Sequence, residues 1–327
     1  MVSSEDREII FGICHKLKKE AGLDINESTV DKLSMQGFNS EVYMARADKG
    51  IIIHILKPAE EQIRQNINRK LMGVSKLIKS FIEIPSAEFF YEETLEDGRF
   101  IFVQEMLPGK NWGRRKLEDD KIVDEFYPPE NKRYFEQLNT ILVNLHKIKF
   151  TKYGWLKSEK KDVNGTYESW RDFLLIESEL WLKNIWENSE KGYGISREVL
   201  SNVKNKLADL YNKNDHLFES GLASLVHGDM INPGNVLIED ARISGIIDFE
   251  WSLAGDAAWE FAYTGNPMIQ HYFDFCDEVG VNCDRNLFLK KMKFYKILWL
   301  LWAVNVHAQG KELKKALFKE FIESLNA

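Results

Sequence analysis

The feature that constrains the fold most is a pair of short apolar runs with polar residues at their outer ends. The runs 236–238 and 243–247 flank a turn, which predicts a β-hairpin inside an otherwise helical part of the chain. Because a hairpin fixes where its strand ends lie, Asn235 before the first strand and Asp248 after the second are expected side by side. Asp229 lies on the loop that leads to the same edge.

All three side chains carry hard oxygen donors. Carboxylate and amide oxygens suit Mg²⁺ with its remaining water and phosphate ligands, and they do not suit zinc. Such a metal site, beside a carboxylate that accepts a hydroxyl proton, is what phosphoryl transfer from ATP requires. Each part alone also fits an ordinary connection, with an Asp in a turn and an Asn at a strand start. The ordered set from His227 to Glu260 does not fit that simpler interpretation.

The length of 327 residues exceeds the usual size of one compact core, so two lobes are expected. We place the boundary between Met106 and Leu107. The first lobe, 1–106, is predicted to hold helices over 5–20 and 58–80 and strands over 41–45, 50–56, 87–92 and 99–104. The second lobe, 107–327, is predicted to be helical apart from the hairpin, with helices over 132–150, 170–188, 197–217 and from 284 onward.

Charge and cysteine usage bound the class of function. The formal net charge of −7 weighs against a nucleic-acid-binding protein and suits a cationic small molecule, although most cytosolic proteins are mildly acidic. Three scattered cysteines favour reduced thiols. The acidic N-terminal sequence is unlike a secretory signal, and the apolar run 297–304 is too short to span a membrane. We expect a cytoplasmic monomer or dimer without membrane or nucleic-acid partners.

The segment LVHGDMINPGNVLIEDARISGIIDFEWSLAGDAAWEFA, residues 225–262, resembles the signature of the aminoglycoside phosphotransferase and choline kinase superfamily of small-molecule kinases. Weaker similarity extends to the nucleotide-covering hairpin, the hinge and a helix ending in Leu-His, at 37–43, 104–109 and 138–147. Residues 153–155 and 165–174 are similar to the hygromycin phosphotransferase branch. The resemblance covers nearly the whole chain and implies an α+β, two-lobed protein-kinase-like fold, with a small antiparallel-sheet N-lobe that binds the nucleotide and a larger helical C-lobe.

The resemblance also implies a role for each residue of the signature. Asp229 would be the catalytic base that orients the acceptor hydroxyl, and His227 would brace its loop. Asn235 and Asp248 would hold Mg²⁺, and Asp256 would support the loop by hydrogen bonds. The family usually has four residues between the Asp and the Asn, whereas five stand here, so Asn232 is a rival ligand to the preferred Asn235.

For ATP, the resemblance implies that the backbone of Gln104 to Met106 receives the adenine and that Ser40 and its neighbours cover the phosphates. Kinases place a Lys on the third strand, paired with a Glu from the next helix. Here His54 takes that place, Lys57 follows it, and no acid occurs between Glu61 and Glu83. A neutral His–polar pair, substitution by Lys57 and an ordinary core histidine remain open, and reduced ATP affinity is expected.

The acceptor is predicted from charge. Glu250 and Glu260 near the signature are candidate ligands for ammonium groups of an amino-sugar, as are Asp172, Glu177 and Glu179 on the helical insert, although acids on helices usually form a solvated face. Tryptophans, including Trp170, Trp181, Trp186, Trp251 and Trp259, offer an aromatic cage for a quaternary ammonium, although most should be core.

The predicted function is transfer of the ATP γ-phosphate to a hydroxyl of a polar, cationic small molecule such as an aminoglycoside. A choline-type or other metabolite kinase and a catalytically weak nucleotide-binding pseudokinase are the alternatives. Protein kinase activity is disfavoured because no long activation loop follows Asp248.

Overall fold

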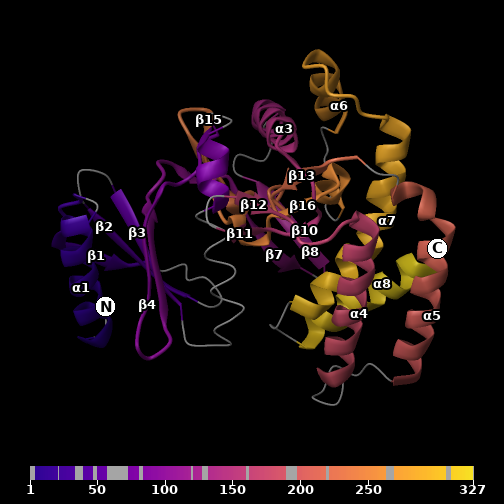
Figure 1. Ribbon diagram of the computed structural model, residues 1–327, viewed down its shortest axis with the longest axis horizontal. Helices are drawn as coiled ribbons and strands as arrows, with labels where there is room; N and C mark the ends of the chain where they lie inside the picture. Colours follow the sequence, from indigo (N-terminus) through magenta and orange to yellow (C-terminus); the bar gives the residue numbers. More distant parts are fainter. Residues whose placement is uncertain are drawn as a thin grey trace. The chain divides into compact units, whose positions relative to one another are not determined.

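The computed structural model (Figure 1) describes most of the chain. The described residues are 4–20, 22–33, 40–46, 50–56, 73–80, 84–118, 121–126, 132–159, 162–188, 197–218, 221–262, 269–306 and 311–326. Lys57, the loop 34–39 and most of the predicted helix 58–80 lie outside them, although 73–80 is helical as predicted. The chain divides into two compact units, one of Met1–Lys110, Lys157–Val163 and Leu237–Glu250, the other of Asn111–Leu156, Asn164–Val236 and Trp251–Ala327.

The first unit is built on a five-stranded antiparallel sheet of order β1-β2-β3-β5-β4. Its strands are β1 (Asn26–Lys32), β2 (Ser40–Arg46), β3 (Gly50–Leu56), β4 (Phe89–Thr94) and β5 (Phe100–Glu105). Residues alternate in β3, so Ile51, Ile53 and Ile55 are buried on one face, where they join a core with Ile10 and Leu17 of α1 (Ser4–Glu20). The helix predicted over 5–20 and the strand pairs predicted over 41–45 with 50–56 and over 87–92 with 99–104 are therefore confirmed.

The predicted hairpin near residue 240 also belongs to the first unit. It consists of β14 (Val236–Glu239) and β15 (Arg242–Ile246), which form a three-stranded sheet of order β15-β14-β6 with β6 (Lys110–Asn111). Asp240 and Ala241 both have positive φ, 45° and 59°, as the tightest hairpin turns require. The short strands β11 (Lys157–Glu159) and β12 (Asp162–Asn164) pair with each other.

The second unit is mainly helical. Its helices are α3 (Lys132–His146), α4 (Trp170–Asn188), α5 (Arg197–Lys213), α6 (Ile269–Glu278), α7 (Arg285–Val306) and α8 (Lys311–Asn326), with 3₁₀ turns η2 (Asp215–Phe218), η3 (Pro233–Asn235) and η5 (Ala257–Phe261). The turn η4 (Phe249–Trp251) begins in the first unit and ends in the second. The apolar run predicted as a buried helix lies in α7, where Leu298, Leu300 and Leu301 have no exposed surface and which packs against α4 and α8. No helix of the described residues is both long and apolar enough to cross a membrane.

A small sheet in the second unit carries the signature loop. Its order is β10-β16-β13-β9, from β9 (Lys149–Phe150), β10 (Gly154–Trp155), β13 (Ala223–Val226) and β16 (Leu253–Gly255). All four residues of β13 are buried, which anchors the loop that begins at His227. Buried anchoring of this kind fixes the position of a loop that must itself reach solvent.

A second hairpin contradicts the expectation that the chain turns helical after Gly109. β7 (Gly113–Glu118) and β8 (Lys121–Phe126) form an antiparallel pair in which Arg114 lies opposite Glu125 and Arg115 lies opposite Asp124. Opposite charges directly across a strand pair stabilise it. Because the pairing surface is charged, the hairpin lacks the apolar alternation by which strands are recognised in a sequence.

Candidate active site

The loop after β13 turns sharply at Gly228. This residue has φ of +87°, and a Cβ there would lie 2.6 Å from the backbone oxygen of Trp251. Only glycine adopts that conformation without strain and leaves room for the neighbouring chain. The turn leaves the Asp229 side chain with 22% of its surface exposed, two residues after the fully buried His227. The Nδ1 atom of His227 accepts a 3.3 Å hydrogen bond from the Asp229 N–H, consistent with the predicted bracing role.

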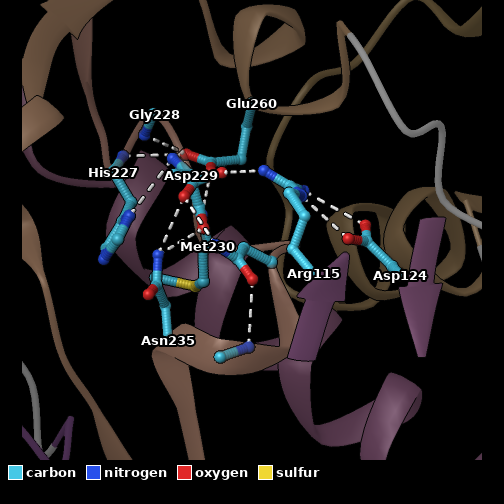
Figure 2. Close-up of polar contacts among 10 residues, drawn as sticks. Arg115, Asp124, His227, Gly228, Asp229, Met230, Asn235 and Glu260 are labelled. Carbon is cyan, nitrogen blue, oxygen red and sulfur yellow. Dashed lines mark hydrogen bonds and ion pairs between the residues drawn. The ribbon is translucent and has the colours of Figure 1, made fainter. Parts of the chain in front are cut away.

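Glu260 of η5 holds the backbone of the loop (Figure 2). Its Oε2 accepts hydrogen bonds from the N–H groups of His227 and Gly228 at 2.8 and 3.0 Å, and its Oε1 accepts one from Met230 at 2.9 Å. The side chain is 6% exposed. This corrects the predicted role of Glu260 as a ligand of the acceptor, because both of its oxygens are occupied by the loop backbone.

Burial raises the pKa of Glu260 to about 7, against the opposing effect of the three N–H donors. Folding thus places against the loop backbone a carboxyl group whose pKa lies near neutral pH. Asp256 adds a further support: one of its oxygens caps η5 by accepting from Ala258 N–H at 3.0 Å, and the other accepts from Lys291 Nζ at 2.6 Å and Tyr295 OH at 3.1 Å. These contacts agree with the supporting role that the resemblance implied.

The two asparagines that competed as metal ligands are used differently. Asn232 caps η3: its Oδ1 accepts from Gly234 N–H at 3.0 Å, and its Nδ2 donates to Asp229 Oδ2 at 2.9 Å. The additional loop residue is accommodated in this turn. Asn235, 6% exposed, donates from Nδ2 to the backbone oxygen and Oδ2 of Asp229, both at 3.0 Å. Its amide nitrogen is thereby fixed, which suits its Oδ1 to a cation and favours Asn235 over Asn232.

A guanidinium that the sequence analysis did not single out contacts the predicted base. Arg115 of β7 donates from Nη1 to Asp229 Oδ1 at 2.7 Å, and from Nε and Nη2 to the two oxygens of Asp124 at 2.8 and 3.1 Å. Figure 2 shows the guanidinium between the two carboxylates. Burial alone would lower the pKa of Arg115, but the charge of Asp229 and the contacts with Asp124 raise it above its ordinary value, so it stays charged.

The two signature acids that follow β15, Asp248 and Glu250, belong to the first unit. Asp248 is exposed and has φ of +67°, a left-handed conformation uncommon for a non-glycine residue. Strained backbone of this kind occurs preferentially at functional sites. Glu250 is half-buried in η4. Asn235 belongs to the second unit, so its pairing with Asp248 on a metal stays a prediction.

His54 is a neutral member of the first unit's sheet. It stacks on Phe102 with ring centroids 4.2 Å apart, and its Nε2 lies 3.3 Å from Gln104 Nε2. Burial lowers its pKa to about 3. Of the alternatives left open, these contacts match the neutral His–polar pair. The resemblance assigns the cation of kinases to this position, and here the position holds an uncharged ring.

The other nucleotide assignments are placed only in part. The Met106 N–H donates to the Gly50 oxygen at 2.8 Å and is therefore occupied, while its side chain is 40% exposed. The Met106 N–H is therefore not placed to donate to an adenine ring, and this part of the predicted adenine contact is wrong. The backbone of Ser40 opens β2, opposite Leu56. Lys57 lies outside the described residues.

Most tryptophans and one predicted acid are core residues. Trp170, Trp181 and Trp259 are at most 6% exposed. Glu177 is buried, and burial raises its pKa against hydrogen bonds from Trp155 and Trp181. Asp172 and Glu179 are exposed, and Glu179 lies 3.9 Å from Lys204, so both belong to a solvated face. Trp251 is half-buried, with ring centroids 6.2 Å from Trp155 and 5.0 Å from Trp302.

Comparison with known families decides the class. A profile described as the phosphotransferase enzyme family matches residues 73–288, roughly two thirds of the chain. The chain belongs to the phosphotransferase enzyme family. The resemblance stated from residues 225–262 is thus confirmed, and the hygromycin branch stays a prediction. Compared by sequence with curated proteins, this phosphotransferase matches none.

Solved structures share the fold of this phosphotransferase. One is the macrolide 2′-phosphotransferase MphH from Brachybacterium faecium, with 14% identity, 98% of each chain covered and a TM-score of 0.57. Another is a thermostable mutant of aminoglycoside phosphotransferase APH(4)-Ia with AMP-PNP and hygromycin B, with 16% identity, 96% of this chain and 98% of that chain covered and a TM-score of 0.62. A third is the gentamicin complex of APH(2")-IIa, with 17% identity, 96% of this chain and 95% of that chain covered and a TM-score of 0.60. The predicted α+β fold is confirmed.

Proposed function

We propose that this phosphotransferase transfers the γ-phosphoryl group of ATP to a hydroxyl of a polar small molecule, with an aminoglycoside-like compound as the leading acceptor. The observation that carries the proposal is the presentation of Asp229 on a loop held by Glu260, with Asn235 fixed on the Asp229 backbone oxygen. A rigidly presented carboxylate beside an amide oxygen suits base-assisted phosphoryl transfer. The similar structures with AMP-PNP, hygromycin B and gentamicin support the choice of nucleotide and acceptor class.

In the proposed step, Asp229 accepts the proton of the acceptor hydroxyl. That oxygen forms a bond to the γ-phosphorus, the bond from phosphorus to the β–γ bridging oxygen breaks, and ADP leaves. Asn235, together with Asp248, would hold Mg²⁺, which would supply positive charge to the phosphate oxygens. The ligand atoms would be Asn235 Oδ1, whose amide Nδ2 is held by Asp229, and the exposed carboxylate of Asp248.

The test is ADP release from Mg-ATP, first without acceptor and then with aminoglycosides, macrolides and amino-alcohols, with mass spectrometry of the acceptor. Stimulation by one compound in the wild type, lost in Asp229→Asn, is expected. Asp209→Asn on the exposed face of α5 is the matched control for a carboxylate-to-amide change and should keep full activity. If all acceptors fail while ATP still binds, the protein is a nucleotide-binding pseudokinase.

A further inference from the structure

We propose that Arg115 is a catalytic residue whose guanidinium contacts the phosphoryl group during transfer and offsets its negative charge. The inference rests on the proposed function of Asp229. It assigns a role to the β7–β8 hairpin, which lies outside the sequence signature.

The placement of Arg115 is set by its own hairpin. Asp124, 9% exposed, lies directly opposite Arg115 and accepts two hydrogen bonds from it, a geometry that fixes both the position and the plane of a guanidinium. The hydrogen bond from Arg115 to Asp229 is made in addition to these two hydrogen bonds to Asp124. Arg115 therefore keeps its place when Asp229 takes a different partner, and Asp124 is a positioning residue.

The reacting atoms must come within reach of this guanidinium. An acceptor hydroxyl that gives its proton to Asp229 lies within hydrogen-bond distance of that carboxylate, and the phosphorus lies about 3–3.5 Å beyond the hydroxyl oxygen before transfer. Arg115 Nη1 is 2.7 Å from Oδ1 of the same carboxylate. With the phosphorus on the Arg115 side of that hydroxyl, the phosphoryl oxygens come within reach of Nη1.

Charge accounts for a change of partner during the reaction. Before transfer, the carboxylate of Asp229 attracts the guanidinium at 2.7 Å. When Asp229 receives the hydroxyl proton it becomes neutral, and its attraction for Arg115 falls. At the same moment the phosphoryl oxygens carry the largest nearby negative charge, so Nη1 donates to them. A preorganised cation that meets developing charge is the most effective form of electrostatic catalysis.

The neutral state of His54 strengthens the inference. The strand position that carries a phosphate-binding cation in kinases holds a ring that burial keeps uncharged. A phosphotransferase with this substitution needs positive charge from another residue, and Arg115 supplies one at the predicted base.

The test compares Arg115→Met and Arg115→Lys with a matched control, Arg114→Met. Arg114 is the preceding residue of β7 and pairs with Glu125 at the surface, so its loss tests the hairpin without the active site. Arg115→Met should lower kcat by ~10²–10³-fold with little change in the KM for ATP, since removal of one preorganised donor to transition-state charge costs on this scale. Arg115→Lys should recover part of the loss, Arg115→Ala should respond to millimolar guanidinium, and Arg114→Met should match the wild type.

Binding of a transition-state mimic gives a second readout. Wild type should bind Mg-ADP with aluminium fluoride more tightly than Mg-ADP alone, measured by calorimetry, and Arg115→Met should lose that gain while binding Mg-ADP normally. The inference is overturned if Arg115→Met keeps or exceeds wild-type kcat, as a residue that merely blocks Asp229 would, or if it keeps the gain. Full turnover in Asp229→Asn would instead remove the proposed function.

Discussion

The signature loop and the β7–β8 hairpin meet at one carboxylate, but they are stabilised in different ways. The loop continues from the buried strand β13, and its backbone N–H groups are bound by a buried glutamate. The hairpin is held by ion pairs across its strands, and Arg114 is 61% exposed at the side chain. Buried hydrogen bonds resist salt, whereas exposed ion pairs are screened by it. The exposed pair of Arg114 and Glu125 should therefore be more sensitive to salt than the hydrogen bonds of the loop, whereas the largely buried pair of Arg115 and Asp124 should be less sensitive than the exposed pair.

The largest expected effect comes from the loop side. Asp229→Asn should lower kcat by at least ~10²-fold, because it removes the positioned base. Its amide oxygen can still accept from Asn232 and Asn235, but its NH₂ group then faces the Arg115 guanidinium, so the melting temperature should fall modestly while the fold is kept. Steady-state kinetics and thermal unfolding check the two parts, and a mutant with unchanged turnover would rule out Asp229 as the base.

On the hairpin side, Asp124→Asn should lower kcat by roughly tenfold, about the loss expected for one charged hydrogen-bond partner. In this variant Arg115 loses one of its two hydrogen bonds to residue 124 but still donates to Asp229. Because the remaining contacts are weaker, the variant should lose more activity than wild type between low and high salt. Equal salt dependence of the two proteins would show that the ion pairs of the hairpin do not position Arg115.

Glu260 ties loop stability to pH. Its folded-state pKa of about 7 lies above the ordinary value of 4.5, so the native protein binds more protons than the unfolded chain between those values. The free energy of unfolding should therefore fall as pH rises from about 4.5 to 7, by about 3 kcal/mol at most from this group. Urea unfolding at pH 5 and pH 7.5 measures the change. Glu260→Gln does not titrate and should show a smaller pH dependence; an equal one would contradict the assignment.

The smallest effect is expected at His54. His54→Phe keeps the stack on Phe102 and removes a group that is already neutral, so the KM for ATP should change less than about twofold. Loss of the contact with Gln104 should cost about 1 kcal/mol of stability. A large rise in the KM for ATP would show that the histidine contacts the phosphates.

The signature loop and the β7–β8 hairpin also differ in how far the sequence predicts them. The β14–β15 hairpin, α1, α4 and the position of Asp229 on the loop after β13 were predictable because each depends on local apolar patterning or turn residues. The role of Asn232 as a cap depends on backbone geometry within three residues and was left open. The contact between Arg115 and Asp229 joins residues 114 positions apart, and its strand carries charges where a strand pattern needs apolar residues. Such a contact is set by tertiary packing alone.

The buried Glu260 carboxyl group that binds the loop backbone has a consequence for spectroscopy. The amide protons of His227, Gly228 and Met230 all point at Glu260, so their chemical shifts should move together in one titration. A ligand that displaces the loop would change the midpoint of that titration. Three backbone signals would thus act as an internal indicator of acceptor binding, without an attached probe or a known product.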